Sequence, residues 1–351
     1  MNQLAPIRLS NVDPPPPGQA VEVADGILWA RLPLPMKLDH VNVYALDDGL
    51  AGWTLVDTGL DWSKGRAALA ALRDGPLRGR RIHRVVLTHH HPDHVGQAAT
   101  LVADGAELLA TRLGWTLARM LTLDEHPRPT PEAVAFRRRA GVVGAALDAY
   151  AAERPFNFAD CVARLPLGYV ALAEGDRLDA GGRQWQVRLG EGHAPDQITL
   201  WAEDGSLVLT ADRVLPAISP NIGVHPTEPA ANPLKGFLET CARFAGLAAA
   251  LPGAADPLVL PGHQNPFTGL GTRLRLLHDN HVRALERVAD GLAERPSTPL
   301  ELFPALYGRQ IGAAETGLAL AEAVAHVNFL AAEGRIVARP RADGSTAWQL
   351  A

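Results

Sequence analysis

Cysteine is scarce in this sequence, since only Cys161 and Cys241 occur among its 351 residues. Two cysteines provide neither a disulfide framework nor a thiolate metal cluster, and they favour a reducing compartment. No run of about 18 apolar residues is present, so no membrane span is expected. A basic start followed by an apolar stretch is also missing, which argues against a secretory signal. We therefore expect a cytoplasmic protein without a membrane partner.

The sequence has no excess of positive charge. Lysine and arginine total 33 against 38 aspartates and glutamates, and the formal net charge is -5. Because nucleic-acid binding usually depends on a strongly basic surface, the composition favours a small-molecule substrate over a nucleic acid. Hydrophobic residues make up 47% of the chain, which is ordinary for a globular protein with a large core.

Hydrophobic periodicity divides the chain into three parts. Residues 1–20 form a proline-rich leader. Residues 21–276 alternate strands and helices and predict an α/β domain, in which residues 112–160 look like a helical insertion that serves as a lid or substrate wall. Residues 277–351 read as helices followed by a terminal hairpin around the turn at Asp343-Gly344.

The densest chemical signal is the turn THHHPDHVG at residues 88–96, which follows a short apolar strand. It supplies three imidazoles and one carboxylate that suit divalent transition metals, from His89, His91, Asp93 and His94. Composition alone would place this pattern in about one such chain in a thousand. One ion cannot comfortably take all four ligands. His89 and His91 can share one metal, whereas the adjacent Asp93 and His94 suit a second.

Three further candidate ligands follow other apolar strands. They are His193 in GHAP, Asp212 in TAD and His263 in PGH. Taken singly, each is more typical of a capping or surface residue. Their common position after a strand is what indicates that they converge on the histidine-rich turn.

These motifs resemble the metallo-β-lactamase-fold superfamily over roughly residues 21–276, with a core similar to that of the hydroxyacylglutathione hydrolases. Residues 88–96 resemble its signature turn, and Asp57 in LVDTG resembles its first motif. The resemblance implies a four-layer αββα sandwich. It also implies one metal held by His89, His91 and His193, a second held by Asp93, His94 and His263, and Asp212 bridging both.

Departures from the wider family narrow the expected function. The zinc β-lactamases lack a bridging aspartate such as Asp212, and the diiron oxygen reductases carry glutamate where this sequence has His91. There is no room for the large inserted domain of the RNA-processing nucleases. The tail beyond Pro296 resembles the winged-helix tail of one subgroup. The simplest role we expect for it is packing or formation of a homodimer.

The sequence thus predicts a dinuclear hydrolase in which a hydroxide bridging two divalent metals attacks an ester-like bond, preferably a thioester or lactone. Zinc is the default, with manganese or iron as alternatives. Asp93 would help protonate the leaving group, and Asp57 would orient a ligand imidazole. Asn221 and His225 are candidate substrate contacts, because their loop follows Asp212 closely. The alternatives are phosphodiester cleavage of single-stranded RNA and a catalytically silent metal-binding protein.

Overall fold

The computed structural model describes residues 5–252 and 256–351, which form two compact units. The first unit combines the described parts of 5–125, 157–220 and 244–274. The second combines 126–156, 221–243 and 275–351, so part of the expected helical insertion groups with the C-terminal segment. In the described part of the chain, no helix is long and apolar enough to cross a membrane.

The first unit contains two seven-stranded sheets. In one of them, neighbours pair antiparallel from β2 to β5 and parallel from β5 to β8. Its strands in spatial order are β2 (Ala20–Ala24), β3 (Ile27–Pro33), β4 (His40–Asp47), β5 (Trp53–Val56), β6 (Ile82–Val86), β7 (Glu107–Ala110) and β8 (Val170–Ala171).

The second sheet is antiparallel except between β12 and β13, which run parallel. Its strands in spatial order are β1 (Arg8–Leu9), β14 (Phe267–Thr268), β13 (Leu258–Pro261), β12 (Leu207–Ala211), β11 (Gln197–Ala202), β10 (Arg183–Gly190) and β9 (Arg177–Ala180). The two-residue strands β1, β8 and β14 were not expected from the sequence, because two residues show no periodicity.

The two sheets pack face to face around an apolar core. Alternate residues of β3 point to opposite faces, so Trp29 joins this core whereas Leu32 lies on the other side of the sheet. The second sheet contributes Trp185 and Leu200, both fully buried. Burial of each large apolar side chain contributes about 1.5–3 kcal/mol, so this interface is a main source of the unit's stability.

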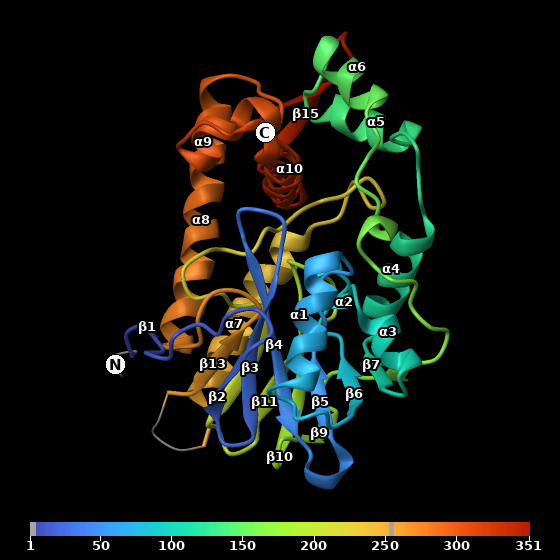
Figure 1. Cartoon of the computed structure of the whole chain (residues 1–351). Helices are drawn as coiled ribbons and strands as arrows, with labels where there is room; N and C mark the ends of the chain where they lie inside the picture. Colours follow the sequence, from blue (N-terminus) through green and yellow to red (C-terminus); the bar gives the residue numbers. More distant parts are fainter. Residues whose placement is uncertain (1–4, 253–255) are drawn as a thin grey trace. The chain divides into compact units, whose positions relative to one another are not determined.

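Helices cover the outer faces of both sheets. Helix α1 lies against the first sheet (Figure 1), and its Leu69 and Leu72 belong to the same buried cluster as Leu32 of β3. On the second sheet, the ring of Phe244 contacts that of Trp201, with 5.3 Å between centroids. The predicted four-layer αββα order is therefore confirmed. The helices of this unit are α1 (Ser63–Asp74), α2 (Pro92–Val95), α3 (Ala98–Ala103), α4 (Arg112–Leu123), the short η1 (Gly49–Ala51) and η2 (Phe158–Asp160), and the end of α7 (Pro233–Ala249).

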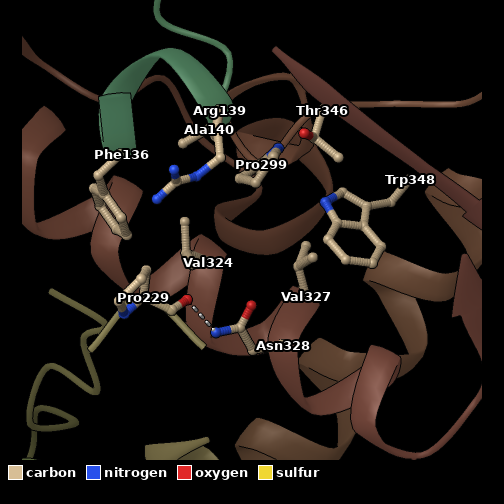
Figure 2. Close-up of a pocket in the computed structure, with 10 residues that line it drawn as sticks. All are labelled: Phe136, Arg139, Ala140, Pro229, Pro299, Val324, Val327, Asn328, Thr346 and Trp348. Atoms are coloured by element: carbon tan, nitrogen blue, oxygen red, sulfur yellow. Dashed lines mark hydrogen bonds between the residues drawn. The ribbon is translucent and has the colours of Figure 1, made fainter. Parts of the chain in front are cut away.

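The second unit consists mainly of helices and ends in the expected hairpin. Its elements are α5 (Pro131–Arg139), α6 (Ala145–Ala152), most of α7, α8 (Leu270–Glu294) from Arg275 onward, η3 (Leu300–Leu302), α9 (Phe303–Tyr307), η4 (Ala313–Glu315), α10 (Thr316–Ala332), β15 (Ile336–Pro340) and β16 (Thr346–Leu350). A mostly apolar cavity of about 100 Å³ lies beside α10, which contributes Val324, Val327 and Asn328 to its lining (Figure 2). The winged-helix interpretation of the tail stays a prediction.

Candidate metal centre

The candidate ligands follow the ends of strands in both sheets of the first unit. The histidine-rich turn comes after β6, Asp212 directly after β12, and His263 two residues after β13. Carboxyl ends of parallel strands meet at one edge of a sheet, which is why residues so far apart in the chain converge. The turn itself leads into α2, whose first residue, Pro92, suits the start of a helix.

Three histidines form the first group of side chains that could hold a metal: His89, His91 and His193. The Nε2 atom of His89 lies 3.0 Å from Nδ1 of His91. The ring of His193 lies 4.5 Å from that of His91, measured between centroids. The structure thus brings His193 to the two turn histidines, as the sequence analysis expected.

Asp93, His94 and His263 form the second group. An oxygen of Asp93 lies 3.6 Å from Nε2 of His94 and 3.4 Å from Nε2 of His263. Asp212 lies between the groups. Its Oδ2 atom is 3.4 Å from Nε2 of His193 and 3.1 Å from Nε2 of His263, and its Oδ1 atom is 3.5 Å from Nε2 of His94. One carboxylate therefore reaches ligand atoms of both groups.

The donor set fits divalent metal ions. Ligand atoms at about 2.1 Å from a tetrahedral metal lie about 3.4 Å from each other, which matches the spacings within each group. Among the described residues, Nε2 of His94 and Oδ1 of Asp212 are buried and have no hydrogen-bond partner. Buried polar atoms are normally paired, so two such atoms aimed at the same space fit the binding of a cation.

Asp57 contacts the candidate ligands from behind. Its Oδ2 atom accepts hydrogen bonds from Nδ1 of His94 at 2.8 Å and from the Thr88 hydroxyl at 2.8 Å. Because the Thr88 hydroxyl donates to Asp57, its oxygen accepts a hydrogen bond from Nδ1 of His89 at 3.0 Å. Both imidazoles therefore carry their hydrogen on Nδ1 and present Nε2 to the candidate site. One carboxylate thus supports one histidine of each group.

We expect Asp57→Asn to lower metal affinity and activity by about 10–100-fold, the usual effect of removing a carboxylate behind a metal ligand. The asparagine keeps the shape, but its NH₂ group would face N–H or O–H donors of His94 or Thr88. Zinc affinity measured by competition with a chromogenic chelator tests this. Unchanged affinity would show that the tautomers are held by other contacts.

Sequence reasoning missed the residues of β4 that hold the His263 loop. The backbone oxygen of His40 accepts a hydrogen bond from Nδ1 of His263 at 2.7 Å. Asn42 donates to the carbonyls of Pro261 and Gln264 on either side of that histidine, at 2.8 and 2.7 Å. A buried asparagine in an apolar strand was the available signal, because such an amide needs partners.

Burial and neighbouring charges shift the pKa values of His89 and His94 in opposite directions. Burial lowers the pKa of His89 well below its usual value, and the imidazoles of His94 and His91 lower it further. Burial also acts on His94, but the carboxylates of Asp93 and Asp212 outweigh it and raise the pKa of that imidazole well above the usual value. The site thus combines neutral imidazoles with carboxylates that attract positive charge, which is the electrostatic pattern a metal requires.

The backbone around the site is strained. Asp57, Ala211 and Gln264 have φ values of 62°, 44° and 67° although none is glycine. Such left-handed conformations cost about 1–3 kcal/mol each and cluster at functional sites.

The backbone of Gly262 lies very close to the candidate ligand Asp212. A Cβ atom on Gly262 would lie 2.1 Å from Oδ1 of Asp212. Only glycine therefore fits before His263.

Asn221 and His225, the candidate substrate contacts, belong to the second unit. There Asn221 donates hydrogen bonds to the backbone oxygen of Leu318 at 3.2 Å and to the carboxylate of Glu322 at 3.0 Å. The ligands of the candidate centre all belong to the first unit. Contact of Asn221 or His225 with substrate stays a prediction.

Comparison with known proteins agrees with this geometry. Residues 36–290 match the model of the metallo-beta-lactamase superfamily. The chain belongs to this superfamily. Residues 285–351 match the model of the metallo-beta-lactamase-like C-terminal domain.

Relatives cover nearly the whole chain. A beta-lactamase domain protein from Burkholderia ambifaria is 33% identical, with a TM-score of 0.85 over 97% of this chain and 96% of its own. A probable metallo-hydrolase of Bacillus subtilis is 26% identical over 89% of this chain and 94% of its own length. A hydroxyacylglutathione hydrolase of Cereibacter sphaeroides is 29% identical over 51% of this chain and 53% of its own. The superfamily member described here is thus a metal-dependent hydrolase.

Proposed function

We propose that this metallo-β-lactamase superfamily protein hydrolyses an ester-like bond, with a thioester or lactone as preferred substrate, using two divalent metals. The observation that carries the proposal is the position of Asp212, whose oxygens lie within 3.5 Å of His193 on one side and of His94 and His263 on the other. His89 and His91 would complete the first metal site, and Asp93 the second.

When bound, two such ions lower the pKa of a water nucleophile and polarise a carbonyl oxygen. Zinc is the first ion to expect for nitrogen and oxygen ligands, with manganese or iron as alternatives. Asp57 keeps His94 and, through Thr88, His89 in the tautomer that ligation requires.

Asp93 is the best-placed residue to move a proton. Its side chain is 19% exposed, whereas that of Asp212 is 8% exposed, so Asp93 is the more accessible of the two carboxylates. A carboxylate oxygen there could accept a proton from the attacking water and pass it to the leaving group as the bond breaks. A thiolate or alkoxide leaving group needs such a proton less than an amine does, which favours thioesters and lactones.

The name of the Cereibacter relative, hydroxyacylglutathione hydrolase, supports including an acylglutathione thioester among the compounds to test. The net charge of -5 argues against RNA as substrate, because a nuclease needs a basic path along the phosphates.

The deciding experiment is a screen of metal-loaded protein against thioesters, lactones, phosphodiesters and single-stranded RNA, with His89→Ala as control. We expect turnover of a thioester or lactone that the control lacks. Cleavage of RNA or phosphodiesters without turnover of any carbonyl compound would replace the proposal with the nuclease alternative.

A further inference from the structure

A second group of metal-binding side chains lies in the second unit, apart from the residues discussed above. His281 of α8 and Glu322 and His326 of α10 place one ligand atom each within 4.8 Å of one another. Glu322 and His326 are four residues apart on a helix, so they share one face. The Nδ1 atom of His281 lies 3.4 Å from Nε2 of His326.

We propose that His281, Glu322 and His326 bind a third divalent transition-metal ion, with zinc as the first ion to test. Two imidazoles and one carboxylate are an ordinary zinc ligand set that leaves a fourth position for water. The proposal does not depend on the reaction at the first site, because it concerns different residues and is tested by metal binding alone.

The spacing and tautomers favour an ion. Two nitrogens bound to one tetrahedral zinc lie about 3.3 Å apart, close to the separation of the two imidazoles here. Nδ1 of His326 donates to the backbone oxygen of Glu322 at 2.8 Å, which leaves Nε2 with a lone pair directed toward His281. A histidine that donates its other N–H to a carbonyl is the usual arrangement of a metal ligand.

Neighbouring groups hold the remaining ligands in place. The ring of His281 meets that of Phe237 edge to face, with 5.1 Å between centroids. The amide of Asn221 donates to Oε2 of Glu322 at 3.0 Å. Asn221 therefore acts as a positioning residue for the carboxylate, an assignment different from the substrate contact expected from the sequence.

The charges and pKa shifts of the cluster also favour binding of a cation. His281 and His326 are at most 1% exposed, and Glu322 is partly buried. Burial raises the pKa of Glu322 to about 7 and lowers that of His326 to about 4. Over the residues described, no lysine or arginine forms an ion pair with Glu322, and Arg287 instead donates to the carbonyls of Ala305 and Leu306. A divalent ion would stabilise the buried carboxylate and the neutral imidazoles together.

The cavity beside α10 is a separate feature. It is lined by Val324, Val327 and Asn328, whereas Glu322 and His326 are not among its lining residues (Figure 2). The amide of Asn328 is already bonded to the carbonyls of Pro229 and Ala231. The cavity therefore provides no ligands to the proposed ion.

The test is the zinc content of the full chain, free of any affinity tag, after loading and exhaustive dialysis. The wild type should retain one equivalent more than Glu322→Gln, which keeps the side-chain shape. Glu333→Gln, an exposed glutamate at the end of the same helix, is the matched control and should retain as much as the wild type. Equal zinc content in all three chains would overturn the proposal.

A second measurement does not depend on any variant folding. An anomalous difference map at the zinc edge, from crystals of the loaded wild type, should contain a peak between His281 and His326. A map without that peak would also overturn the proposal, and either result leaves the assignment of the first site untouched.

Discussion

Asp212→Ala is expected to reduce hydrolysis by more than about a hundred-fold and to lower the metal content of the chain. Substitution of a residue behind a ligand alone costs about 10–100-fold, and Asp212 is itself placed to contact both ions. Without its carboxylate, His263 also loses its nearest negative charge, and His94 loses one of the carboxylates beside its Nε2 atom. His91→Ala should have an effect of similar size, because it removes one of three ligands of the first group.

Activity toward the best substrate of the screen and metal content by mass spectrometry should be measured on the same preparations. Asp204→Ala provides the matched control, since Asp204 is an exposed aspartate of the same unit that accepts hydrogen bonds from the nearby Ser206. Full activity with unchanged metal stoichiometry in Asp212→Ala or His91→Ala would refute the assignment of the site.

Removal of metal with a chelator should abolish activity and lower the melting temperature of the protein. An ion that binds only the folded chain stabilises it by RT ln(1 + [L]/Kd), which is about 4 kcal/mol when the ion is present at 1,000 times Kd. Part of this free energy arises because, without the ion, the buried carboxylate of Asp212 faces the imidazoles with no cation between them. Readdition of zinc, manganese or iron should restore both properties, and the ion that restores most activity identifies the preferred metal.

Calorimetry before and after chelation, with metal removal verified directly, checks this expectation. A metal-free sample that melts at the same temperature and keeps its activity would mean that the cluster is a hydrogen-bonded network and not a metal site.

The sequence predicted most of this architecture because the chain follows simple periodicities. Trp185, Val187 and Leu189 alternate with polar residues, and this pattern correctly placed β10. The same strand-end reasoning placed His193, Asp212 and His263 near the histidine-rich turn, and the structure brings all three there. Asp57 was identified because LVDTG resembles the first motif of the superfamily, and its orienting role was expected on the condition that its strand ends beside the turn.

The features that the sequence did not predict depend on contacts between segments far apart in the chain, and periodicity does not encode such contacts. His40 and Asn42 secure a loop more than 200 residues away, as separations of 219 to 223 residues show. The cluster of His281 and His326 was not recognised because the two residues are 45 positions apart on different helices. The second unit likewise joins three separate stretches of chain that no local signal connects.

The central claim is that seven side chains hold two metal ions, and crystallographic anomalous scattering from the loaded protein tests it most directly. The account predicts two peaks in the first unit, one beside His89, His91 and His193 and one beside Asp93, His94 and His263, with Asp212 next to both. A single peak, or no peak among these residues in crystals of active protein, would contradict it.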